Sequence, residues 1–166
     1  MLPDMETGLR EAILREFEEE TAGTRRVLER VPGDKLRWKP HPKSFTLGQL
    51  CEHLAAIPNH AAVIVNGKAR KLPAITNKAD LLQAVELSIA AGREAIAGSS
   101  DAHLSAPMGP DPEIARPRTA WLRQRVLSHM IHHRGQLSVY LRLLEVAVPG
   151  MYGPSADEKP GSAGWN

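Results

Sequence analysis

Four long stretches of this 166-residue chain carry apolar residues three or four positions apart, and no stretch between them shows a convincing apolar–polar alternation. The first spacing is typical of amphipathic α-helices, and the second would indicate half-buried strands. We expect helices at about residues 5–31, 46–66, 78–97 and 119–146, followed by an irregular tail over residues 147–166. Four such helices bury their apolar faces most simply as a four-helix bundle, so we predict one all-α domain over residues 1–166.

Local signals mark several boundaries of these helices. Thr46 and Gln49 have the spacing of a capping box, and Asn77 is the expected N-cap of the third helix. Pro58 lies inside the second helix and predicts a kink or a break there. The proline-rich residues 101–118 are expected to form a loop.

Composition limits the class of protein. Hydrophobic residues make up 42% of the chain, which is ordinary for a soluble domain of this size. The single cysteine, Cys51, excludes an intrachain disulfide; it is expected to be buried, although a reactive thiol stays open. A formal net charge of +2 gives no reason to expect a nucleic-acid partner. Because no signal core or transmembrane run is found, we expect no membrane association and a cytoplasmic protein.

The strongest functional signal is the run His129-Met130-Ile131-His132-His133-Arg134-Gly135-Gln136 in the last predicted helix. His129 and His133 are four residues apart, so they share one helix face and can reach one divalent ion. Zinc peptidases with H-E-x-x-H have a glutamate where this chain has Met130, which argues against that class. Both histidines fall inside the apolar stripe and should face the core, whereas Arg134 falls outside it. Two hydrogen-bonded packing histidines are the alternative.

A catalytic metal usually has three protein ligands and an open position. His53 and His60 lie two turns apart on the second predicted helix, so they should not bind the same ion. Spacing favours His53 modestly, because His60 follows the proline, and His132 remains a substitute ligand. Two glutamines, Gln49 and Gln136, lie one turn from ligand positions and could orient imidazoles or bond locally.

The segment Phe45-Thr46-Leu47-Gly48-Gln49-Leu50-x-x-His53-Leu54, followed downstream by His129-x-x-x-His133-Arg134-Gly135-Gln136, resembles the DinB-like (YfiT-like) superfamily of metal-dependent enzymes. Residues 140–144 and 148–158 are also similar to members, so the resemblance covers nearly the whole chain. It implies a four-helix bundle of the DinB/YfiT-like type in which His53, His129 and His133 bind a divalent metal. It also implies zinc, nickel or iron as the ion, and a homodimer.

Characterised relatives in that superfamily include thiol-dependent S-transferases and a mycothiol-dependent isomerase. We therefore expect a metal-dependent enzyme, either a hydrolase or a transferase that uses a low-molecular-weight thiol, acting on a small-molecule substrate. No convincing general base stands out. Glu52 should project away from the site, and Asp157 and Glu158 could fold back over it or stay in solvent.

Two other hypotheses make different predictions. A non-catalytic metal-binding or dimerisation module would have a closed site with four ligands, and chelation would strongly destabilise it. A bundle without metal would need the three histidines to lie apart or to be satisfied by hydrogen bonds within the protein.

Overall fold

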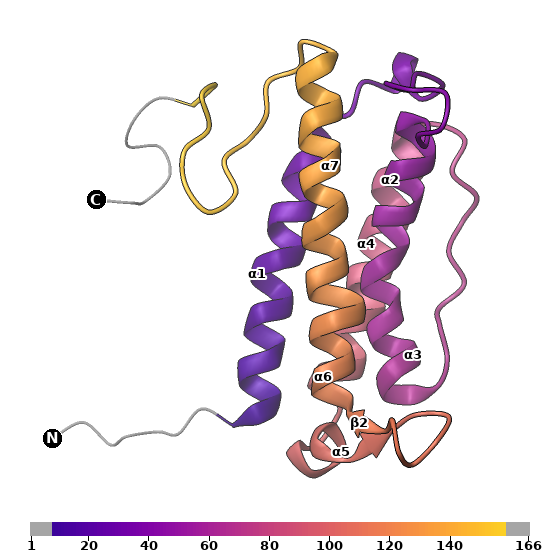
Figure 1. The fold of residues 1–166 in the computed structure, drawn as a ribbon, viewed down its shortest axis with the longest axis vertical. Helices are drawn as coiled ribbons and strands as arrows, with labels where there is room; N and C mark the ends of the chain where they lie inside the picture. Colours follow the sequence, from indigo (N-terminus) through magenta and orange to yellow (C-terminus); the bar gives the residue numbers. More distant parts are fainter. Residues whose placement is uncertain (1–7, 159–166) are drawn as a thin grey trace, which may run out of the picture.

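Four helical rods make up the bundle, and two of them are interrupted (Figure 1). The computed structural model describes residues 8–158. The first rod is α1 (Leu9–Glu29) and the third is α4 (Lys78–Ala97). The second consists of α2 (Leu47–Ala56), the 3-10 turn η2 (Ile57–Asn59) and α3 (His60–Asn66). The last consists of α6 (Arg118–Leu122), the π-helical segment η3 (Arg123–Ser128) and α7 (His129–Leu143).

Each rod packs against two neighbours, so the rods form a closed ring around one core. The first rod contacts α4 and α7, and α2 contacts the same two helices from the other side. This arrangement confirms the predicted all-α four-helix bundle. The expected helix start near residue 5 and the end of the tail lie outside the described residues.

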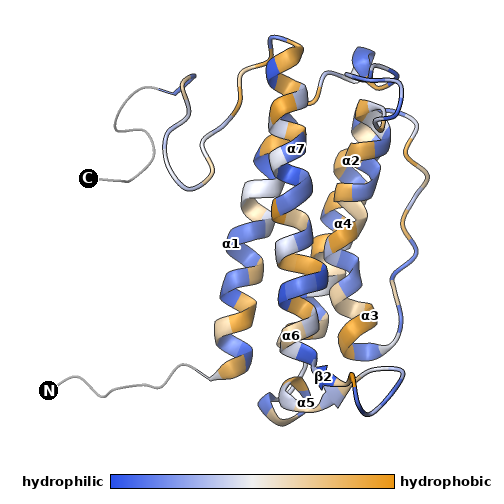
Figure 2. Cartoon of the chain, viewed as in Figure 1, coloured by the Kyte–Doolittle hydropathy of each residue, from blue (hydrophilic) through white to orange (hydrophobic). Residues whose placement is uncertain are grey.

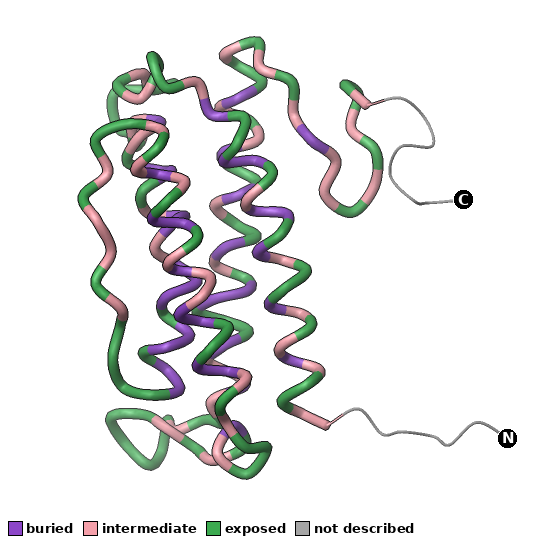
Figure 3. The backbone as a smooth tube through the Cα atoms, turned by 180° about the vertical axis from the view of Figure 1, so that it is seen from behind, coloured by how far each residue is buried: buried purple, intermediate pink, exposed green. Residues whose placement is uncertain are grey.

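The hydropathy pattern explains this arrangement. Apolar and polar residues alternate along every rod in Figure 2, and buried residues recur along each rod in Figure 3, as amphipathic helices require. None of the described helices is long and apolar enough to cross a bilayer. The largest fully buried side chains are Ile13, Phe17, Leu28, Leu47, Leu50, Leu54, Ile57, Leu81, Ile96, Leu104, Leu122 and Met130.

The local boundary signals are confirmed. The Gln49 backbone N–H donates to Thr46 Oγ1 at 3.1 Å, and the Thr46 N–H donates to Gln49 Oε1 at 2.9 Å, which completes the capping box. The Asp80 N–H donates to Asn77 Oδ1 at 3.0 Å and caps α4. The second rod breaks at Pro58, as predicted, because proline has no N–H to continue the helix.

The proline-rich segment 101–118 is more ordered than the prediction of a loop. It contains the short α-helix α5 (Asp101–Ser105). It also contains the two-residue strands β1 (Pro107–Met108) and β2 (Arg116–Pro117), which pair antiparallel. The Asp101 carboxylate accepts hydrogen bonds from the Leu9 and Arg10 N–H groups at 3.0 and 2.9 Å. This residue therefore caps α1, whose own N-cap makes no side-chain hydrogen bond. A short 3-10 turn, η1 (Gly33–Lys35), follows α1.

The prediction that Arg134 lies outside the buried face is wrong. Its side chain is only 3% exposed. The guanidinium donates to Glu20 Oε2 at 2.6 Å, to the Glu20 carbonyl at 2.9 Å and to the Tyr152 hydroxyl at 2.5 Å. Charge and hydrogen bonds from α1 and the tail thus compensate the burial of this cation. The last helix also ends earlier than expected, at Leu143 rather than near Val146.

Candidate metal centre

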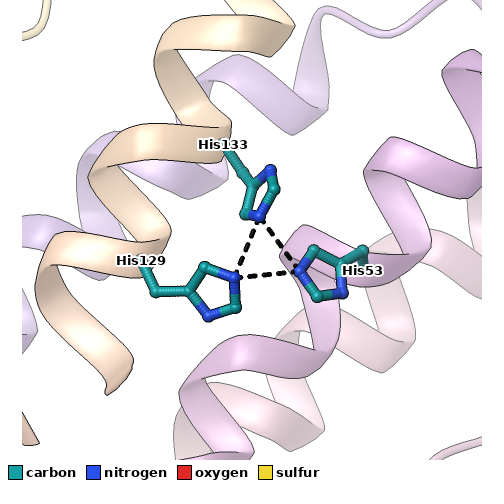
Figure 4. Close-up of side chains that lie close together, drawn as sticks. All are labelled: His53, His129 and His133. Carbon is teal, nitrogen blue, oxygen red and sulfur yellow. Dashed lines mark hydrogen bonds between the residues drawn. The ribbon is translucent and has the colours of Figure 1, made fainter. Parts of the chain in front are cut away.

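Three histidine side chains from two rods meet at one point (Figure 4). Helix α2 supplies His53, and α7 supplies His129 and His133. The three Nε2 atoms form a nearly equilateral triangle, with His53 3.1 Å from each of the other two and those two 2.9 Å apart. All three residues are half-buried rather than enclosed in the core. The capping box fixes the start of α2, and one helical turn separates the pair on α7.

The spacing fits one metal ion. With metal–nitrogen distances of about 2.0–2.1 Å, adjacent nitrogens of a tetrahedral or octahedral ion are about 2.8–3.4 Å apart. The three observed distances fall within that range. Imidazole nitrogen is a common ligand of zinc, nickel and iron. The three histidines could therefore hold a metal ion.

Protons alone cannot satisfy this triangle. Each Nε2 of a neutral imidazole either carries a hydrogen or offers a lone pair. With three atoms and two roles, at least one of the three contacts must join two lone pairs or two hydrogens. A cation that accepts all three lone pairs removes this conflict. The donor set thus fits a metal better than it fits three packing histidines.

The two histidines on α7 have further hydrogen-bond partners. The Nδ1 atom of His133 is 2.8 Å from Gln136 Oε1, so this N–H donates to the amide oxygen and leaves a lone pair on Nε2. The backbone of Arg125 is a hydrogen-bond partner of His129. The other glutamine, Gln49, bonds back to Thr46 in the capping box and has no hydrogen bond to the histidines among the described residues.

The electrostatics favour the neutral form of His53 and of His129. Burial is the largest cause that lowers the pKa of His53, and the charges of His133 and His60 lower it further. Burial also lowers the pKa of His129, followed by His133 and His53, while the Arg125 backbone acts in the opposite direction. Neutral imidazoles keep the lone pairs that a metal ion needs.

The remaining predicted candidates lie elsewhere. His60 begins α3 beyond the break, and the residue as a whole is exposed. Partial desolvation of its ring, followed by the Arg125 guanidinium, lowers its pKa. The exposed ring of His132 lies 4.9 Å from the His133 ring but does not join the cluster. Glu52 is exposed as expected.

The tail carboxylates do not join the cluster either. Asp157 pairs with Arg142, at 2.5 Å from Oδ2, and accepts the Val148 N–H at 2.9 Å, while Glu158 is half-buried within the tail. Within residues 8–158, no His, Cys, Asp or Glu adds a fourth ligand to the triad.

One feature near the triad escaped the sequence analysis. Arg125 lies one turn before His129, and its guanidinium carbon lies 5.7 Å from the ring centroid of Trp121, one further turn back. The signal available in the sequence was the four-residue spacing of Trp121, Arg125 and His129. These three residues lead along the last rod from the triad to Trp121, which lines a pocket.

The fold and the cluster together define a helical bundle whose three histidines, from its second and last rods, could hold a metal ion. The chain matches the family model of the DinB superfamily over residues 16–137, and it belongs to that superfamily. The resemblance noted in the motifs is thereby confirmed.

Solved structures agree with this assignment. The chain is similar to a DinB-like protein from Bacillus cereus, with a TM-score of 0.71 and 25% identity over 89% of this chain and 100% of that one. It shares its fold with a DinB-like protein from Bacillus subtilis, with a TM-score of 0.70 and 21% identity over 84% of this chain and 97% of that one. No curated protein matches the chain.

Proposed function

We propose that this chain is a metal-dependent enzyme that acts on a small molecule, either as a hydrolase or as an S-transferase that uses a low-molecular-weight thiol. In this proposal His53, His129 and His133 are the protein ligands, and the ion is zinc, nickel or iron. The observation that carries it is three imidazole nitrogens within 3.1 Å of one another without a fourth ligand among the described residues.

The missing fourth ligand separates this proposal from a structural metal site. Structural zinc sites are closed by four protein ligands, whereas catalytic sites keep a position for water or substrate. The half-buried rings leave the triad accessible. The bundle also has a continuous hydrophobic core drawn from all four rods, so we expect it to fold without the ion.

The nucleophile in such an enzyme is a water or a thiol co-substrate, because the protein's own cysteine cannot supply it. The single cysteine, Cys51, is buried, and burial raises the pKa of its thiol to about 12. It therefore supplies no thiolate near neutral pH. When bound, a divalent ion acts as a Lewis acid and lowers the pKa of a coordinated water or thiol. Both classes of co-substrate fit the proposal.

The protein's own groups hold and orient the ligands. Gln136 Oε1 accepts a hydrogen bond from the His133 Nδ1–H, which keeps the ring in one tautomer and one orientation. The Arg125 backbone is a hydrogen-bond partner of His129. The break at Pro58 ends α2 one turn after His53, so the ligand lies on a helix segment capped at its start and fixed at its end.

The test is elemental analysis of untagged protein purified without chelator. We expect about one equivalent of metal per chain in the wild type, and none in His53→Ala or His129→Ala. His132→Ala is the matched control, because this exposed histidine lies on the same helix outside the triad, and it should keep its metal. A wild type that stays empty after reconstitution with zinc, nickel and iron would contradict the proposal.

Chelation then distinguishes the enzyme from the structural module. An ion that binds only the folded state stabilises it, so its removal should lower Tm modestly while unfolding remains cooperative. A structural site would instead unfold on chelation. Screening of thiol-transfer and ester- or amide-hydrolysis substrates on the loaded protein identifies the reaction class.

A homodimer is part of this proposal. The outward side of α7 carries two exposed apolar residues one turn apart, Val139 and Leu143. An exposed apolar pair of this kind can pack against the same pair of a second copy. Sedimentation velocity should give a dimer for the wild type and a monomer for Val139→Lys, whereas a monomeric wild type would refute the dimer.

A further inference from the structure

A pocket of about 570 Å³ is lined by residues of α3, α6 and the β1–β2 hairpin. These elements meet at one end of the bundle (Figure 1). Its apolar wall consists of Ile64, Met108 and Trp121, together with the proline and glycine residues of the hairpin. The Trp121 indole is held in place, since its Nε1–H donates to the Met108 carbonyl at 2.8 Å. This pocket offers a flat aromatic surface to an apolar group of a small molecule.

Positive charge surrounds that apolar wall. The guanidinium carbons of Arg116 and Arg125 lie 5.3 and 5.7 Å from the Trp121 ring centroid, and Arg118 lines the pocket itself. None of these three arginines forms an ion pair within residues 8–158. The pocket lining includes no carboxylate. An anion would therefore meet several cations without an internal competitor.

One of these cations has an unused donor. Nη1 of Arg118 donates to the His103 and Ala106 carbonyls, at 3.4 and 3.2 Å, which fixes the side chain against α5. Its Nε is buried and has no hydrogen-bond partner among the described residues. Buried donors are usually paired, so an unpaired donor beside a pocket indicates a missing acceptor.

The pocket and the triad are linked by the last rod. Trp121, which lines the pocket, Arg125 and His129 follow one another at four-residue intervals along α6, η3 and α7. Across from them, α3 packs against α6 and η3, with His60 at its start and Ile64 one turn later.

We propose that this pocket and the adjoining Arg125 bind a small-molecule substrate with an apolar body and a carboxylate, the body on Trp121 and the carboxylate on Arg125, which lies between Trp121 and His129 along the last rod. The inference names the substrate class of the site and so rests on the proposed function. A guanidinium binds a carboxylate through charge-assisted hydrogen bonds, and an uncharged amide in the same place loses that attraction.

The experiment measures binding to metal-free protein by isothermal titration calorimetry, with naphthylacetate and its uncharged amide as paired probes. The acid should bind the wild type about tenfold or more tightly than the amide, as one charged hydrogen bond implies. Arg125→Gln should remove most of this preference, although Arg116 and Arg118 remain. Arg123→Gln is the matched control, because it removes the same charge two residues away, where the side chain pairs with Glu16, and it should keep the preference. Trp121→Leu should weaken both probes.

Three results would overturn the inference: no saturable binding of naphthylacetate, equal affinity for acid and amide, or an equal loss in the two arginine variants. Because the protein carries no metal in this assay, its outcome is independent of the elemental analysis. Metal binding without a preference for the acid would refute the substrate class alone. A preference for the acid in a chain that never binds metal would refute the metalloenzyme alone.

Discussion

Replacing Glu20 by Gln should destabilise the bundle more than replacing its partner, Arg134. The pair joins α1 to α7 at a distance of 2.6 Å, and its two ends differ in burial. The arginine side chain is 3% exposed and the glutamate 17%. Glu20→Gln therefore leaves a cation stranded in the interior, whereas Arg134→Met leaves a carboxylate that can turn toward water.

The size of the expected stability loss depends on the hydrogen bonds that the Arg134 guanidinium retains. Removing one member of a buried pair costs about 3–5 kcal/mol when the other stays charged and unpaired. Here the Glu20 carbonyl and the Tyr152 hydroxyl still accept hydrogen bonds from Arg134, and the new amide oxygen can accept one. We therefore expect a loss of about 2–3 kcal/mol for Glu20→Gln and about 1–2 kcal/mol for Arg134→Met.

Urea denaturation followed by circular dichroism measures both losses. For a chain of this length, about 2–3 kcal/mol corresponds to a decrease in Tm of about 5–10 °C. Glu18→Gln is the control, since its 2.7 Å pair with Arg93 is exposed on both sides and should contribute less than about 1 kcal/mol. The reasoning is refuted if Glu20→Gln costs no more than Glu18→Gln, or less than Arg134→Met.

Two further predictions concern glycine packing and the tail. In α4, a Cβ on Gly92 would lie 2.5 Å from the Pro58 carbonyl oxygen, so Gly92→Ala should lower the free energy of unfolding by about 1–3 kcal/mol despite the better helix propensity of alanine. Gly135→Ala, on the open side of α7, should raise it by up to about 1 kcal/mol. Changes of the same sign in urea denaturation would contradict the close approach at Gly92. The hydrogen bond from Arg142 lowers the pKa of Asp157 to about 2. The tail contact is therefore fully present above the ordinary carboxyl pKa of about 4 and is lost as pH falls toward 2. Carboxyl NMR should show this titration, and an ordinary pKa for Asp157 would disprove the contact.

Features set by neighbouring residues could be predicted from the sequence. The capping box at Thr46 and Gln49, the cap at Asn77 and the break at Pro58 each depend on atoms within one turn. The pairing of His129 with His133 depends only on helical spacing. The approach of His53 to that pair depends on how two rods pack, and spacing alone favoured it only modestly over His60.

Features set by distant partners could not be predicted. Arg134 is buried because Glu20, 114 positions away, and the tail satisfy its donors. Asp101 caps α1 from 92 positions away, and nothing near Gly8 announces it. A helical projection places Arg134 outside the buried face, because it registers the charge and not the groups that compensate it, and Asp101 was expected in a loop.

The π-helical segment is an intermediate case, since its signal is present in the sequence. Leu122, Val126, Leu127 and Met130 are all buried, at positions i, i+4, i+5 and i+8. A regular α-helix buries i, i+3, i+4 and i+7 on one face. The buried positions are spaced one residue wider than an α-helix allows. The π-helical segment η3 accommodates this extra residue in a wider turn, so apolar residues at both ends of the last rod face the core.

Deletion of one exposed residue from this segment tests the explanation. Without Gln124, the four buried positions take the regular α-helical spacing, and both Trp121 and His129 keep their faces. We expect the deletion variant to unfold within about 1 kcal/mol of the wild type in urea, because the register of the core is preserved. Deletion of Ile131, exposed but in the regular part of the rod, rotates everything beyond it by about 100° and should cost several kcal/mol. Equal losses for the two deletions would mean that η3 does not compensate an extra residue.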